Sequence, residues 1–139
     1  MSRAILLLFV ILLSAPCFAE SKLSFKDAWV REAPPMAKNL AGYAEVTNAG
    51  QEALTIVSII SPIFERVEMH VTTLKNGMMR MKHLENLTLA AGESVYFEPG
   101  GKHFMLIKPK KPIKAGLTVP FLIKLQSEEV FSFDLKVRK

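Results

Sequence analysis

Histidine and methionine residues stand close together in the middle of the chain. His70 and Met81 are followed by the pair His103 and Met105, and His83 comes just after Met81. Thioether sulfur is a soft, uncharged ligand that favours Cu(I), and imidazole also binds copper well. Ca²⁺ and Mg²⁺ prefer oxygen ligands, and zinc prefers more His, Cys or carboxylate. These residue types therefore indicate a Cu(I) site.

The first part of this region predicts a β-hairpin whose register can be worked out. Asn76-Gly77 is a strong hairpin signal, because both central residues of a type I′ turn have positive φ. In this register His70, Met79, Met81 and His83 share one face. His70 and Met81 become diagonal neighbours, about 7 to 8 Å apart. The predicted pairs are Lys75 with Met78, Leu74 with Met79, Thr72 with Met81, and His70 with His83.

His103 and Met105 form the second part of the candidate site. They lie two residues apart on a predicted strand, so both side chains project from the same face. The turn sequence Pro99-Gly100-Gly101 precedes them and places the pair near a strand end. The hairpin and this strand can therefore converge on one ion. His83 remains a candidate ligand beside Met81, because the predicted register puts it directly opposite His70.

The elements that must position these residues are short strands. β-rich runs alternate with turn residues, and no segment keeps apolar residues at helical spacing for three turns. The regular turn spacing predicts an all-β sandwich or Greek-key barrel. Trp29 and most of the nine Phe are expected to fill its core. The nine expected strands cover residues 23–30, 42–47, 53–60, 66–74, 78–84, 94–97, 103–107, 119–125 and 130–137.

Residues 1–19 have the pattern of a secretory signal peptide. A lone Arg3 precedes the apolar run 4–13, which is shorter than the roughly 20 residues of a membrane span. Cleavage is expected after Ala19, which leaves residues 20–139 as a single domain without stable membrane insertion. Lipidation at Cys17 is the alternative.

Removal of this signal peptide removes the only cysteine of the chain. The mature protein would then lack the thiolate needed for blue-copper electron transfer, thiol redox chemistry or a typical structural zinc site. No Lys/Arg run alternates with stacking aromatics, so nucleic acid is not an expected partner. No Ser/His/Asp set or carboxylate pair stands out, and an enzyme is not predicted.

The spacing of the four metal-ligand candidates resembles that of a known family. Ten residues separate His70 from Met81, twenty-one separate Met81 from His103, and one separates His103 from Met105. This pattern is similar to the signature of the periplasmic copper chaperones called PCu(A)C. The motifs of residues 28–31 and 92–95 also resemble that family, and the resemblance covers nearly the whole mature chain.

The resemblance implies a cupredoxin-like sandwich of about eight to nine strands that binds one Cu(I) per monomer in the periplasm. Its ligands would be His70, Met81, His103 and Met105. The family signature leaves out His83, which the hairpin register keeps, together with Met79, as a possible auxiliary residue. The copper would pass to an apo-cuproprotein, such as cytochrome c oxidase subunit II, which would take it up at its dinuclear copper centre. Some members take Cu(II) on a His- and Met-rich C-terminal tail, whereas this sequence ends in Leu135-Lys136-Val137-Arg138-Lys139, so a second copper site is not expected.

Two other functions are compatible with the residues. A copper buffering or resistance protein would have the same site but no dedicated acceptor. A metal-free exported interaction domain would carry its His and Met residues incidentally, so their substitution would leave Cu(I) affinity unchanged.

Overall fold

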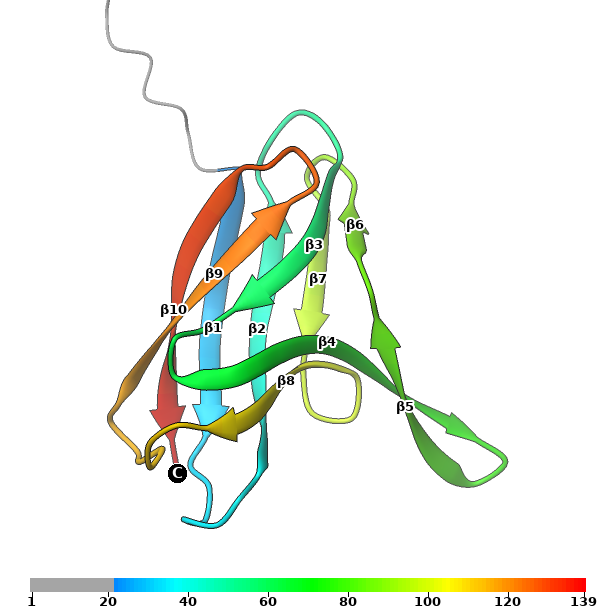
Figure 1. Cartoon of the computed structure of the whole chain (residues 1–139). Helices are drawn as coiled ribbons and strands as arrows, with labels where there is room; N and C mark the ends of the chain where they lie inside the picture. The colour runs from blue at the N-terminus through cyan, green and yellow to red at the C-terminus, as the bar shows by residue number, and fades with distance from the viewer. Residues whose placement is uncertain (1–21) are drawn as a thin grey trace, which may run out of the picture.

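The computed structural model describes residues 22–139, so the predicted signal peptide, its cleavage site and Cys17 lie outside the described residues. In this part of the chain every regular element is a β-strand, and no helix is long and apolar enough to cross a membrane. The ten strands (Figure 1) are β1 (Leu23–Arg31), β2 (Asn39–Asn48), β3 (Leu54–Ile60), β4 (Phe64–Lys75), β5 (Met78–Leu84), β6 (Leu87–Leu89), β7 (Ser94–Phe97), β8 (Lys102–Pro109), β9 (Thr118–Leu125) and β10 (Val130–Arg138).

The strands form one hydrogen-bonded sheet that curls around a common core. Its order is β5-β4-β8-β7-β2-β1-β10-β9-β3-β6, with a further pairing of β8 with β2. β4 and β8 run across the lower part of the molecule, at an angle to β1, β2 and β10 (Figure 1). The far end of β4 continues with β5 into a hairpin arm that extends beyond the body of the sandwich. The all-β prediction is confirmed.

All nine predicted strands are present, and the structure adds β6, which the sequence analysis missed. β6 pairs with β3 over three residues only, from Leu54 opposite Leu89 to Ile56 opposite Leu87. A run this short shows no measurable alternation of apolar and polar residues. It is therefore defined by its partner strand and not by its own sequence.

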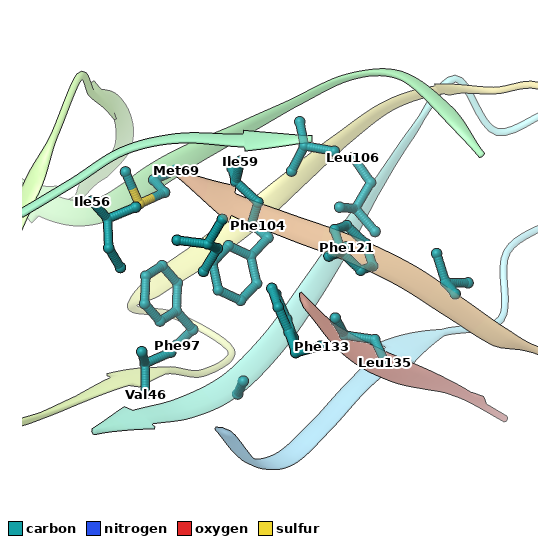
Figure 2. Close-up of a cluster of buried hydrophobic side chains, with 14 of the residues drawn as sticks. Val46, Ile56, Ile59, Met69, Phe97, Phe104, Leu106, Phe121, Phe133 and Leu135 are labelled. Atoms are coloured by element: carbon teal, nitrogen blue, oxygen red, sulfur yellow. The ribbon is translucent and has the colours of Figure 1, made fainter. Parts of the chain in front are cut away.

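Alternation along the strands explains how the core is filled. In β10, Phe133, Leu135 and Val137 are buried, while the side chains between them are exposed. Successive side chains of a strand point to opposite faces, so this pattern places one apolar row inside. Figure 2 shows these rows meeting, with Phe104 and Phe121 facing Phe133 in the interior. Burial of each such aromatic side chain contributes about 1.5 to 3 kcal/mol to folding.

Trp29 is not part of this core, so that prediction was wrong. A register shift between Lys26 and Trp29 changes the phase of the alternation along β1, so the inward position falls to Val30, which is fully buried. The indole lies half-buried on the outer surface against Tyr43, with ring centres 4.8 Å apart, and the Arg138 guanidinium lies 5.7 Å from the ring centre. The prediction holds for the buried phenylalanines, which are Phe64, Phe97, Phe104, Phe121 and Phe133.

Candidate metal centre

The β4–β5 hairpin has the predicted turn and the predicted register. Asn76 and Gly77 have φ values of 52° and 73°, as a type I′ turn requires. Thr72 lies opposite Met81, and His70 lies opposite His83. The four predicted pairs are therefore confirmed residue for residue. Met69 points to the other face of β4 and is buried in the core.

β8 lies on the other side of β4 and brings the second pair of candidates to the same face. His103 is opposite His70, and Met105 is opposite Glu68. Three histidines therefore form a row across β5, β4 and β8. The ring centre of His70 lies 5.4 Å from that of His83 and 5.7 Å from that of His103.

A tight turn before β8 fixes the start of this strand against β4. The Gly101 amide donates to the Glu98 carbonyl over 3.0 Å, and Gly100 has a φ of 84°. Pro99 followed by a positive-φ glycine is typical of a type II turn. The Gly101 carbonyl in turn accepts the Thr72 amide of β4 over 3.0 Å. The turn is thereby attached to the strand that carries His70.

The same carbonyl orients the imidazole of His103. Nδ1 of His103 lies 3.3 Å from the Gly101 oxygen, and His103 is only 6% exposed. Because a carbonyl oxygen can only accept, Nδ1 carries the proton. Nε2 is then the unprotonated nitrogen, with its lone pair available to a metal ion.

His70 has the opposite arrangement. Its Nε2 lies 2.8 Å from Oε2 of Glu68, and a carboxylate can only accept, so Nε2 carries the proton. Its Nδ1 is buried and has no hydrogen-bond partner among residues 22–139. A buried polar atom without a partner costs about 1 to 3 kcal/mol. A metal ion bound to the free lone pair would compensate this cost, so the residues present fit a metal site.

Glu68 is a residue of the site that the sequence analysis missed. It bonds to His70 and forms an ion pair with Arg66. The His70 hydrogen bond, assisted by the Arg66 charge, lowers the Glu68 pKa, although partial burial acts in the other direction. A carboxylate that holds the second nitrogen of a ligating histidine is common at metal sites. The signal in the sequence was a Glu two positions before His70, on the same face of the strand.

The two thioether candidates differ in their surroundings. Met105 is half-buried on β8, and Ala41 of β2 lies opposite it. Met81 is 62% exposed on the hairpin arm, and its neighbours Met79 and His83 are exposed as well. His70, His103 and Met105 thus lie on the neighbouring strands β4 and β8, whereas Met81 lies on the edge strand β5.

Nitrogen and carboxylate groups by themselves do not complete a metal centre here. Across residues 22–139, no three His, Cys, Asp or Glu side chains are arranged to hold an ion. The face described above provides two imidazoles with free nitrogens and two thioethers. It is a soft donor set.

Comparisons with known proteins identify a matching family and two relatives of similar sequence. The model of the family described as "Putative lipoprotein LpqE-like" matches residues 23–137. A "Putative lipoprotein" of Leifsonia xyli subsp. xyli is 29% identical over 98 residues, which are 70% of this chain and 58% of that protein. An uncharacterized protein of Rickettsia prowazekii is 29% identical over 102 residues, which are 70% of this chain and 56% of that protein. The chain therefore spans little more than half the length of these relatives.

Two solved structures share the fold. The Cu(I) form of DR1885 from Deinococcus radiodurans superimposes with a TM-score of 0.70 and 27% identity, covering 90% of this chain and 83% of that one. The copper-bound PCuAC domain from PmoF2 gives a TM-score of 0.70 with 18% identity, covering 87% of this chain and 96% of that domain. The predicted cupredoxin-like fold and the resemblance to PCu(A)C domains are confirmed.

Proposed function

Because the chain belongs to the LpqE-like family and has the fold of PCuAC domains, we propose that it binds one Cu(I) ion and delivers it to another protein. The ligands in this proposal are His70, Met81, His103 and Met105. The single observation that carries it is the buried Nδ1 of His70, which has no hydrogen-bond partner among residues 22–139 and belongs to the residue opposite His103.

The chemistry of the four ligands supports a soft, monovalent ion. Two imidazoles with free nitrogens and two thioethers are all uncharged, and thioether sulfur favours Cu(I) over harder ions. Glu68 orients His70 without supplying a ligand atom, since its Oε2 is already bonded to Nε2. In this site the β4–β8 side holds the ion, and Met81 on the arm completes the coordination.

The relatives support the proposed compartment, and the proposed acceptor is the one that the family resemblance implies. Relatives described as lipoproteins support export, and we place the protein in the periplasm as a monomer. The acceptor would be an apo-cuproprotein such as cytochrome c oxidase subunit II, which has a dinuclear copper centre. Exposure of Met81 supports a carrier role, because an incoming ligand of the acceptor can displace an exposed thioether first.

A competition titration tests the metal site. Cu(I) is titrated into a mixture of the full chain and a chromophoric Cu(I) chelator, and the same is done with the double variant Met81→Ala/His103→Ala. We expect the double variant to lose Cu(I) competition. An unchanged affinity would support the metal-free interaction domain instead.

A transfer experiment separates delivery from storage. The Cu(I)-loaded protein is mixed with apo-subunit II, and copper in each protein is measured after separation. Transfer faster than from a Cu(I)–chelator complex of equal affinity is the expected result. Transfer no faster than from that complex would indicate the buffering function.

A further inference from the structure

The tryptophan and tyrosine side chains of the chain lie on the outside of the sandwich, on neighbouring strands. The sequence has one Trp and two Tyr, which are Trp29 on β1, Tyr43 on β2 and Tyr96 on β7. These three strands are adjacent in the sheet order (Figure 1). The rings of Trp29 and Tyr43 are in contact, with centres 4.8 Å apart, and Tyr96 is 56% exposed. The three side chains together are called the aromatic face below.

An irregularity of β1 turns Trp29 outward. Phe25 faces the core, where its ring stacks on Phe133 with centres 4.0 Å apart. Strict alternation would continue this inward row to Trp29, four residues later. The register shift between Lys26 and Trp29, where Asp27 has a φ of 48°, reverses the phase. Bulges often re-aim a side chain next to a functional site, and this one exposes an aromatic ring that regular alternation would have buried.

The aromatic face adjoins the candidate ligands of β8. Met105 lies opposite Ala41 of β2, so Tyr43, two residues farther along β2, is its diagonal neighbour at about 7 to 8 Å. Between them, Gly42 lies opposite Phe104, and both of these residues are buried. Because side chains alternate between the two faces of a sheet, Tyr43 and Met105 both point outward. The aromatic rings and the proposed copper site therefore share one surface.

A protein that takes copper from this surface must also cover the aromatic face. A standard protein–protein interface buries about 800 Å² on each partner, which is a patch about 30 Å across. β8 pairs with β2 and β2 pairs with β1, so Trp29 lies only about two strand spacings, or about 10 Å, from β8. Trp and Tyr are enriched among the residues that contribute most to protein interfaces. Rings that are already packed together also lose little conformational freedom on binding.

The charges beside Trp29 favour an acidic partner. Lys136 of β10 lies opposite Trp29. Two residues farther along these strands Arg31 lies opposite Arg138, whose guanidinium is 5.7 Å from the indole centre. None of these three cations forms an ion pair among residues 22–139. The carboxylates at neighbouring positions all lie on the other side of Trp29, toward the start of β1, and are Asp27, Glu45 and Asp134.

We propose that the aromatic face, with the three cations beside it, docks an acidic surface of the protein that accepts the copper. The inference rests on the proposed function, because it names the contact surface for the same transfer. Attraction between complementary charges mainly increases the rate at which two proteins associate. This surface contributes no ligand atom to the proposed Cu(I) site. Its substitution should therefore change the rate of copper transfer and leave Cu(I) affinity unchanged.

Transfer kinetics under second-order conditions test the aromatic part of the surface. The Cu(I)-loaded full chain is mixed with dilute apo-subunit II of cytochrome c oxidase, and the transfer rate constant and the Cu(I) affinity are both measured. We expect Tyr96→Ala to lower the rate constant at least about tenfold, since truncating a central interface aromatic commonly costs that much or more. Ile60→Ala truncates an equally exposed side chain on β3, where Ile60 is 55% exposed, and should leave the rate constant unchanged.

Charge reversal tests the basic part. Arg138→Glu should lower the rate constant at low salt, and its difference from the unmodified protein should shrink at high salt, because exposed charges are screened. Lys124→Glu makes the same change in net charge on β9 and should have no such effect. Cu(I) affinity within twofold of the unmodified protein is expected for all four variants, which verifies that each one is folded.

The proposal and the function on which it rests can fail separately. Rate constants of Tyr96→Ala and Arg138→Glu equal to those of their controls would overturn the docking surface, because the acceptor would then bind elsewhere. Failure of the proposed function would appear in the unmodified protein itself. It would then bind no Cu(I), or transfer copper no faster than a Cu(I)–chelator complex of equal affinity.

Discussion

β4 has two neighbours, and the halves of the candidate site that they form differ in burial and support. On the β8 side, His103 is 6% exposed and is held by a backbone carbonyl. On the β5 side, Met81 is 62% exposed, and β5 pairs with no strand other than β4 among the described residues. A two-stranded hairpin has little stability of its own. One half is therefore preorganised, while the other half is positioned by a single strand pairing.

This difference suits a protein that must hold an ion and later release it. Ligands whose orientation is fixed before binding increase affinity, because they lose little conformational entropy when the ion arrives. An exposed ligand on an edge strand contributes less to affinity and is accessible to a competing ligand. The comparison therefore predicts unequal effects of substitutions on the two sides of β4.

The largest effect is expected from His103→Ala. This change removes a buried, oriented imidazole, and we expect Cu(I) affinity to fall at least about a hundredfold, which is about 2.7 kcal/mol. Competition with a chromophoric chelator measures it. His83→Ala is the matched histidine control on the exposed side and should change Cu(I) affinity less than twofold. Similar losses in both variants would contradict the proposed asymmetry.

A smaller effect is expected from Met81→Ala. The exposed thioether contributes to coordination without preorganisation, so Cu(I) affinity should fall about tenfold, or about 1.4 kcal/mol. Transfer to a competing chelator, followed by stopped-flow absorbance, should become faster. Met79→Ala, which changes an equally exposed methionine two residues away, serves as the control. The prediction fails if both methionine variants behave alike.

An effect of a few fold is expected when the arm loses its turn. Gly77 has a φ of 73°, which a β-branched residue adopts only at a cost of about 1 to 3 kcal/mol. Gly77→Val should therefore accelerate hydrogen exchange of the β5 amides and weaken Cu(I) binding. Gly92→Val introduces comparable backbone strain, since Gly92 has a φ of 75°, but in the turn before β7. Unchanged β5 exchange in Gly77→Val would show that the turn does not determine the register.

The smallest effect concerns stability of the metal-free protein. The pKa of Glu68 in the folded state lies below its ordinary value of 4.5, because of the His70 hydrogen bond and Arg66. The ionised carboxylate thus contributes stability above pH 4.5, and this contribution declines as the pH falls through the lowered pKa. Urea unfolding of the unmodified protein and Glu68→Gln should differ by less than about 1 kcal/mol at neutral pH. This difference should shrink below pH 4.5, and growth of the difference would contradict the assignment.

The sequence was sufficient where the structure depends on local contacts. The Asn76-Gly77 turn determines the pairing of β4 with β5, and every predicted pair of that hairpin is present. The alternation of β10 and the inward position of Met69 were likewise predictable from the period of a strand. These features follow from residues that are neighbours along the chain.

The remaining features depend on contacts between distant segments. The pairing of β8 with β4 places His103 opposite His70, and no turn connects these two strands directly. The proton positions on the two imidazoles depend on Gly101 and Glu68, whose contacts appear only once β8 and β4 are aligned. The placement of Trp29 outside the core also depends on tertiary packing. The four candidate ligands are unequal in this respect, since only the relation of His70 to Met81 follows from local sequence.

The Gly101 carbonyl has a consequence for protein engineering. One oxygen serves both the Thr72 amide and the His103 ring, so the turn is a structural part of the face that carries the candidate ligands. Transplanting the four candidate ligands onto another β-sandwich would not by itself reproduce that face. A functional graft would have to include the Glu98–Gly101 turn at its original length, because one inserted residue would displace the oxygen from both partners.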